Sequence, residues 1–330
     1  MPTGPVLRRA FATRERALHK QLAVALEGDG HAVHQARVAT RRLREALPVL
    51  GASLPRKRVR KLRQRMRKLT QLFGAVRERD VALKMLDHHE LGGLDPSGAE
   101  RVRALVHDGR NAARHRLADA LDAHKVARWL EDVKAFEQEL GDLPAEQRDT
   151  AWPVVLARRL LKRSERLRRA VNDAGMLFVS ERLHAVRVAL KQLRYAVELA
   201  SELGRRKLDA TVDELKLNQD TLGELHDLDM LMSYVDGALE AEIEPHVRAS
   251  LDTLQTRLEA ERHDLHAKYL AHQPALLVLI DRIQDQIVPR FNMAKMDAKT
   301  AAANGSRRRQ LPQNLRRQEP AERAGTSVRR

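Results

Sequence analysis

The chain of 330 residues contains no cysteine and only ten aromatic side chains. Without cysteine it has no disulfide scaffold, no cysteine-ligated zinc site and no thiol nucleophile. The longest apolar run, residues 275–280, is far shorter than the roughly 20 residues that a membrane-spanning helix needs. Charged residues come too early at the N-terminus for a secretory signal. These absences predict a cytoplasmic protein without a membrane span.

Positive charge, by contrast, is abundant. There are 61 Lys and Arg residues against 45 Asp and Glu, a formal net charge of +16. This excess favours a polyanionic partner: nucleic acid, an acidic membrane surface or a phosphate polymer. Residues 294–330 hold ten Lys and Arg against three acids, a net charge of +7, and few large apolar residues. That composition is typical of a disordered basic tail, and the rest of the chain keeps +9.

The composition and pattern of the body of the chain predict helices. Hydrophobic residues make up 43% of the sequence, enough for a core, and good helix formers are common. No segment shows the alternation and turn signals of a β-hairpin. We therefore predict an all-α fold with helices of about 15 to 30 residues, and a capping box at Ser97 and Glu100. Breaks are expected at 28–30, 51–55, 92–98, 141–144, Gly204 and Pro245.

An internal repeat is the most informative feature. Residues 34–44, HQARVATRRLR, recur 150 positions later at 184–194 as HAVRVALKQLR. Residues 74–81, GAVRERDV, recur 149 positions later at 223–230 as GELHDLDM. Two blocks in the same order at nearly the same offset predict a duplicated chain.

The repeat divides the body into two equivalent halves, about 5–140 and 150–291. The functional surface is expected where these halves face each other. Asp80 and Asp229 occupy equivalent places in the second block, six residues after its glycine, and we expect each to anchor a loop or pair with a ridge arginine rather than catalyse a reaction.

Within each first block the basic residues are spaced three, four and three apart. At 100° per residue they fall within an arc of about 80° on one side of a helix, and the apolar residues lie on the other side. Neighbouring cations repel by a few tenths of a kcal/mol per pair, so a row without intervening acids indicates a binding surface. We call these rows the basic ridges: His34, Arg37, Arg41 and Arg44 in the first half, and His184, Arg187, Lys191 and Arg194 in the second.

A second basic segment follows the first ridge. Nine of the thirteen residues in 56–68 are Lys or Arg, although an apolar stripe persists. The run fits a solvated face as well as the wall of a binding channel, and Arg60 and Arg67 are the stronger binding candidates. The second half keeps Lys216 at the place of Arg67.

The motifs themselves resemble a known family. The ridge motif with the later Phe-Gly-x-x-Arg-x-x-Asp of residues 73–80, and its variant with Lys191 to Tyr195 and Leu222-Gly223, resembles the CHAD family of conserved-histidine α-helical domains over about residues 5–291. The resemblance implies two pseudo-symmetric helical bundles around a basic central channel that binds inorganic polyphosphate.

By position, the resemblance also assigns polyphosphate binding to particular side chains. They are His34, Arg37, Arg41, Arg44, Arg60, Arg67, Arg77, His184, Arg187, Lys191, Arg194 and Lys216. Two positions depart from the family pattern, since Glu78 stands where Asp is usual and His226 takes the place of Arg77 in the second half.

Charge chemistry agrees with a phosphate chain as the ligand. Such a chain has regularly spaced charge and no base edges, so it calls for repeated guanidinium forks and ammonium groups. The histidines add a conditional charge, because nearby cations disfavour their protonation and bound phosphate favours it. We expect tighter binding near pH 6 than near pH 8, which bracket roughly the ordinary histidine pKa.

Two other functions fit this sequence less well. Nucleic-acid binding is the main alternative, but single-strand and RNA readers use aromatic stacking, and aromatics are only 3% of this chain; the tail could still contact nucleic acid weakly. A metal-dependent phosphohydrolase is less favoured, because the pairs His107-Asp108, His226-Asp227 and His263-Asp264 lie in unrelated surroundings and no phosphate loop or His-Glu-x-x-His is present.

The sequence thus predicts a non-catalytic polyphosphate-binding protein without metal or cofactor. Three uses fit such a protein: residence on polyphosphate granules, scaffolding for a phosphate enzyme, and regulation by chain length.

Overall fold

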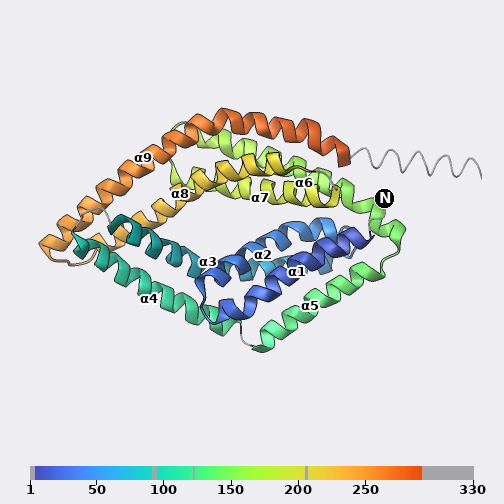
Figure 1. Cartoon of the computed structure of the whole chain (residues 1–330), viewed down its shortest axis with the longest axis horizontal. Coiled ribbons are helices and arrows are strands. Elements are labelled where there is room, and N and C mark those ends of the chain that lie inside the picture. The colour runs from blue at the N-terminus through green and yellow to red at the C-terminus, as the bar shows by residue number, and fades with distance from the viewer. Residues whose placement is uncertain (1–3, 91–94, 122, 205–206, 292–330) are drawn as a thin grey trace, which may run out of the picture.

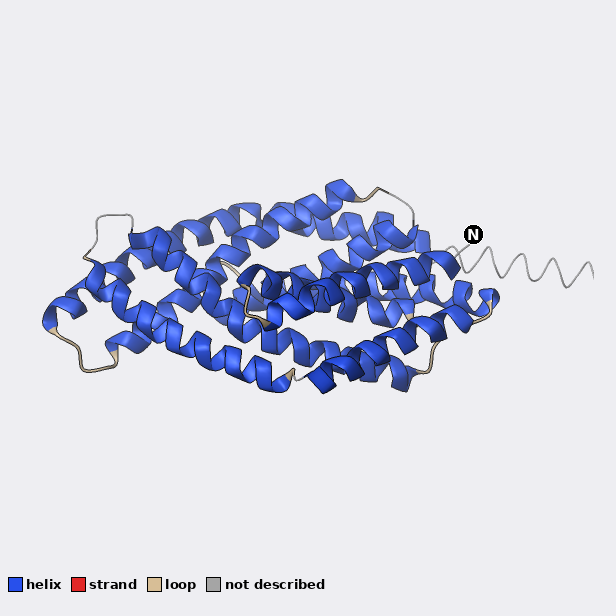
Figure 2. Cartoon of the chain, turned by 60° about the horizontal axis from the view of Figure 1, so that its bottom comes forward, coloured by secondary structure: helices blue, strands red, loops and turns tan. Residues whose placement is uncertain are grey.

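In a computed structural model, residues 4–90, 95–121, 123–204 and 207–291 are described. Within these residues the secondary structure is helical and no strand occurs (Figures 1 and 2), which confirms the all-α prediction. The predicted tail, 294–330, lies outside the described residues. The helices are α1 (Gly4–Leu26), α2 (Gly30–Leu50), α3 (Arg56–Glu90), α4 (Pro96–Ala120), α5 (Ala123–Asp142), α6 (Ala145–Ala174), α7 (Ser180–Gly204), α8 (Asp209–Leu239) and α9 (Pro245–Arg282), followed by the π-helical turn η1 (Ile283–Ile287).

The helices form two layers in an elongated molecule (Figure 1). In the first layer α2 packs between α1 and α3, and in the second α7 packs between α6 and α8. The layers meet through α2 with α7, α3 with α8, and α4 with α9. Each of these contacts joins helices at equivalent positions of the predicted repeat, although the duplication itself stays an inference from sequence.

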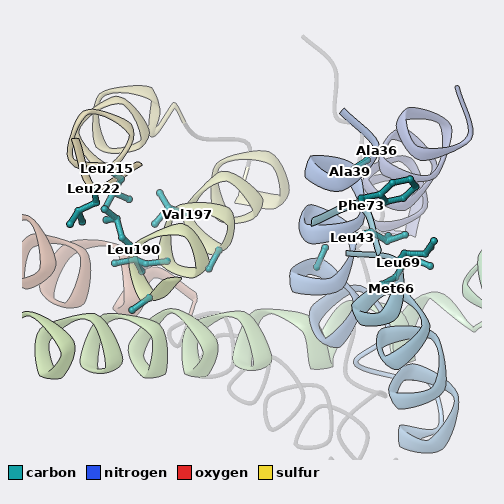
Figure 3. Packing of buried hydrophobic residues seen from close by; sticks show 14 of the residues in the cluster. Ala36, Ala39, Leu43, Met66, Leu69, Phe73, Leu190, Val197, Leu215 and Leu222 are labelled. Carbon is teal, nitrogen blue, oxygen red and sulfur yellow. The ribbon is translucent and has the colours of Figure 1, made fainter. Parts of the chain in front are cut away.

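The apolar faces of the ridge helices pack as their spacing predicts. Figure 3 shows the α2 side chains turned toward α3 and the α7 side chains turned toward α8. Leu43 and Leu193 are fully buried. Because this face is fixed in the core, the basic side of each helix is held in one orientation. The labelled residues are Ala36, Ala39, Leu43, Met66, Leu69 and Phe73 in one layer and Leu190, Val197, Leu215 and Leu222 in the other.

Two local predictions were wrong. The helices α3 and α9 have 35 and 38 residues, longer than expected, and they continue through Gly74 and Pro274 respectively. The capping box does not form: α4 begins at Pro96, and Asp95 caps it by accepting a hydrogen bond from Ser97 N at 2.9 Å. Proline cannot donate from its nitrogen, so it suits the first helical position, and the cap lies at Asp95, two residues before Ser97.

No helix in the described ranges has an apolar stretch long enough to cross a bilayer.

Candidate functional site

The two basic ridges face each other where α2 meets α7. Their positions are helical throughout, and their side chains are partly or fully withdrawn from solvent except that of His184. Lys191 is only 7% exposed. Its neighbours include Arg187 on its own helix and Arg37 and Arg41 across the contact. The structure therefore brings cations from both halves of the chain into one cluster.

Tyr195 places an aromatic ring beside Arg41 of this cluster and beside Arg194. The guanidinium carbon of Arg41 lies 5.5 Å from the ring centroid, and that of Arg194 lies 4.8 Å from it. The ring is 6% exposed. A guanidinium over an aromatic face is attracted by the ring quadrupole, so Tyr195 holds Arg41 against α7.

Two acids balance part of the charge, one from each half. A nitrogen of Arg187 lies 3.6 Å from a carboxylate oxygen of Asp227. At the equivalent place in the first half, Glu78 acts on Arg37 by raising its pKa, against the larger lowering by burial and by Arg41. Burial raises the pKa of Asp227, opposed by Arg187. Sequence reasoning treated Glu78 only as a departure from the family pattern and missed this pairing.

Gly74 lies beside the same arginine. A Cβ placed at Gly74 would lie 3.5 Å from Arg37 Nε, which is an ordinary van der Waals contact. The conformation at Gly74 is helical, so neither the backbone nor the contact with Arg37 requires a glycine here.

Three histidines lie at one end of the cluster. The Nδ1 atoms of His184 and His226 are 3.3 Å apart. Burial, with Arg187 as the next cause, lowers the pKa of His226 to about 3, and burial with Arg77 lowers that of His34 to about 4. At neutral pH these rings are uncharged in the empty protein, and each can donate or accept a hydrogen bond.

The opposite end of the first ridge opens into a cleft of about 500 Å³. Arg44 lies there, and Arg60 and Arg67 of α3 form part of its wall. Burial lowers the pKa of Arg44, and Arg41, Arg63 and Arg67 lower it further. Arg44 is therefore the link between the central cluster and this cleft.

A buried ion-pair group closes the cleft on its inner side. Glu45 is 4% exposed. It accepts from Arg163 Nε at 2.8 Å and Nη2 at 3.1 Å, and its carboxylate lies 2.7 Å from Arg159. Burial raises the pKa of Glu45, but the two arginines outweigh it and the net direction is down. No sequence pattern marks this group, because α6 lies outside both repeated blocks.

Two predicted site residues stand apart from the cluster. Arg194 donates to Glu198 at 2.6 Å and to Gln219 at 2.9 Å, so an acid already balances its charge. Lys216 is exposed on α8. Arg77 does belong with the central group, since its charge acts on His34 and on Asp227.

The aspartates of the second repeated block lie near the starts of the ridge helices. Asp229 accepts from Ser180 Oγ at 2.6 Å, at the first residue of α7. Asp80 lies 3.3 Å from the Cβ position of Gly30, where α2 begins, but it accepts its hydrogen bond from Arg110 Nε of α4, at 2.6 Å. In the described residues neither aspartate pairs with a ridge arginine.

Within the described residues, no group of three or more His, Cys, Asp or Glu side chains has a geometry that could hold a metal ion.

Comparison with protein families gives one clear match. The model of the CHAD domain matches residues 9–236 of this chain. Two uncharacterized proteins from strains of Mycobacterium tuberculosis are 28% identical over 232 residues, which cover 68% of this chain and 44% of each relative. The chain thus spans less than half the length of these curated relatives.

Two solved structures share the fold. The crystal structure of the CHAD domain from the plant Ricinus communis is similar with a TM-score of 0.62 and 22% identity, over 85% of this chain and 92% of that one. PptA from Streptomyces chartreusis is similar with a TM-score of 0.59 and 18% identity, over 82% and 99% of the two chains.

Proposed function

Because this chain belongs to the CHAD domain family, we propose that it binds inorganic polyphosphate through the two basic ridges and does not break it down. The observation that carries the proposal is the central cluster, in which Arg37, Arg41, Arg187 and Lys191 converge from both halves of the chain. Glu78 and Asp227 are the carboxylates that oppose them there.

The energetics of the cluster favour a bound anion. Assembling buried cations costs free energy through desolvation and mutual repulsion, and a polyphosphate chain would offset both terms. Guanidinium groups bind phosphate oxygens in bidentate pairs. Binding would also release condensed counterions, so the affinity should weaken as salt rises.

The same geometry supports phosphate over nucleic acid as the ligand. Tyr195 is only 6% exposed, and the guanidinium groups of Arg41 and Arg194 lie over its ring. It cannot serve as a stacking platform for a base. Residence on polyphosphate granules in the cytoplasm is the cellular role that we propose for such a site.

A competition assay tests the proposal. Long-chain polyphosphate and duplex DNA compete for the protein at about 0.15 M salt, where only close charges interact strongly. The full chain and a truncation after residue 293 are compared. Preference of the truncated protein for polyphosphate is the expected result, and preference for DNA would overturn the proposal.

Charge reversal locates the site. The double variant Arg41→Glu with Lys191→Glu should lose polyphosphate binding and keep its helical circular dichroism. Because Lys191 is buried, a glutamate there could prevent folding. The milder pair Arg41→Gln with Lys191→Met tests the same site if the charge-reversal variant does not fold. The matched control is Lys84→Glu with Lys268→Glu, two exposed lysines on α3 and α9. Retained affinity in the ridge variants would move the site off the ridges.

A further inference from the structure

The cleft beside Arg44 is lined mainly by arginine side chains. Its volume is about 500 Å³, and four helices form it: α2, α3, α6 and α7. Its charged side chains are six arginines and one glutamate, without lysine, histidine or an aromatic ring. The lining residues are Arg44, Glu45, Arg60, Arg63, Gln64, Arg67, Arg163, Arg166 and Gln192.

Glu45, the acid in the cleft lining, already forms ion pairs with arginine. Both oxygens of Glu45 accept from Arg163, and Arg159 lies behind it. The other five arginines make no ion pair with an acid in the described residues. Arg166 contacts a neutral group, the side-chain oxygen of Gln192, at 3.5 Å. The cleft therefore holds an excess of unbalanced guanidinium groups in a small space.

This excess is unfavourable without a ligand. Burial and then Arg41 lower the pKa of Arg44, Glu45 opposes them, and the charges of Arg63 and Arg67 lower it further. A stable surface would place glutamates among these arginines. Glu45 instead fixes Arg163, so the charge on the α6 wall is held in place rather than left mobile.

We propose that this cleft is a phosphate-binding subsite of its own, in which Arg63 and Arg166 bind phosphate oxygens together with Arg44 and Arg67. The inference rests on the proposed polyphosphate function and deepens it. It assigns binding to Arg63 and to α6, which no repeated motif marks, and it makes Glu45 the residue that positions Arg163.

The chemistry points to inorganic phosphate chains that present several phosphates close together. Bidentate guanidinium forks match phosphate oxygens, and several forks in one cleft require high charge density. A nucleic acid spaces its phosphates with sugars and adds bases, for which the lining offers no stacking partner. A short chain such as tripolyphosphate meets the requirement by itself.

The central cluster and the cleft lie at opposite ends of the first basic ridge. His34 and Arg44 are ten residues apart on α2, which is about 15 Å along the helix axis. A long chain can cover both the central cluster and the cleft. Tripolyphosphate is too short to do so, and we expect it to occupy the cleft.

The test uses the full chain with two probes, tripolyphosphate and long-chain polyphosphate, in calorimetric titrations. The cleft variant is Arg63→Glu with Arg166→Glu; both side chains are exposed, so folding should be unaffected. The matched control is Lys68→Glu with Arg169→Glu, which makes the same change in net charge at exposed positions of α3 and α6 outside the cleft lining.

We expect the cleft variant to weaken tripolyphosphate binding by at least about tenfold more than the control does, because contacts are lost in addition to net charge. Long-chain binding should weaken less, since the ridges still hold the chain. Equal affinities in the cleft variant and the control would overturn the cleft inference. Loss of tripolyphosphate in the ridge variant Arg41→Gln with Lys191→Met, with retention in the cleft variant, would overturn it too. Failure of the wild type to bind either probe would instead refute the proposed function.

Discussion

The guanidinium carbon of Arg41 on α2 lies 5.5 Å from the centroid of the Tyr195 ring on α7. The two basic helices, 150 residues apart in the repeat, thus meet through a cation and an aromatic face, in addition to the ion pair between Arg42 Nε and Glu198 at 3.2 Å. An aromatic ring attracts a guanidinium without neutralising it, so Arg41 is held in position while its charge stays available to an anion.

Replacing the ring should therefore affect binding more than folding. Tyr195→Leu keeps an apolar side chain but removes the ring face, and we expect a loss of about 1 kcal/mol in the free energy of unfolding. Polyphosphate affinity should fall severalfold because Arg41 loses its support. Urea unfolding and calorimetric titration measure the two effects.

Tyr195→Phe is the control for this prediction, since it retains the ring and loses only the hydroxyl. Wild-type affinity in both variants would show that the ring does not position Arg41.

A second prediction concerns the stability of the empty protein. Burial, then Arg187, Arg41 and Arg37, lowers the pKa of Lys191 to about 5 from its ordinary 10.5. Between these values the unfolded chain binds the proton and the folded chain does not, so this group makes stability rise with pH. Lys191→Met should raise the melting temperature at pH 7 and flatten its dependence on pH. A lower melting temperature in this variant would contradict the lowered pKa.

Polyphosphate binding should raise the pKa of Lys191 again. Bound phosphate favours the charged amine, so polyphosphate binding should take up protons at pH 7 and weaken as pH rises. The groups facing Lys191 are His34, Arg37 and Arg41 on α2, His184 and Arg187 on α7, and His226 and Asp227 on α8.

Calorimetric titration in buffers of different ionisation enthalpy counts the protons taken up. Lys191→Met should remove part of that uptake, and the exposed Lys268→Met should leave it unchanged. The pKa of His34, about 4, and that of His226, about 3, place these rings in the same uncharged state when the site is empty. Proton uptake by Lys191 and by the histidines would each make polyphosphate binding tighter near pH 6 than near pH 8. The Lys191→Met variant shows how much of this pH dependence comes from the lysine.

The buried group at Glu45 gives a third prediction, on stability. Glu45→Gln leaves Arg159 and Arg163 without their counter-charge, and breaking such a buried pair costs about 3–5 kcal/mol. Because the pKa of Glu45 lies below its ordinary value of 4.5, its contribution is present at neutral pH and is lost as pH falls through the folded pKa. Urea unfolding at pH 7 checks the magnitude, with the exposed Glu165→Gln on α6 as the control that should change little.

The sequence predicted much of this arrangement because its signals are local. The three, four and three spacing of the ridges fixes which side of α2 and α7 faces the core, and the glycine and proline breaks lie close in sequence to the helix ends that they mark. The break at Gly175 was missed, although its φ of +62° ends α6 in a conformation that favours glycine. A single glycine without a proline or polar cluster nearby is a weak signal.

Contacts between distant helices were beyond this kind of reasoning. Nothing in the spacing of Glu45 shows that it lies against Arg163, 118 residues later. The partnership of Arg187 with Asp227 could have been found, because Glu78 and Asp227 occupy equivalent places in the second repeated block. An acid retained in both copies beside a basic ridge is a signal for a charge partner.

The basic tail supplies the last prediction, and it concerns selectivity. Residues 294–330 carry a net charge of +7 out of +16, and non-specific binding to DNA depends mainly on the number of phosphates neutralised. Truncation after residue 293 should therefore weaken duplex DNA binding strongly and reduce the slope of its affinity against salt. Polyphosphate binding depends on the ridges and should change little, so the preference for polyphosphate should increase in the truncated protein. Filter binding at several salt concentrations measures both slopes. An equal loss for the two ligands would mean that the tail, rather than the clustered arginines and Lys191, carries the affinity for phosphate.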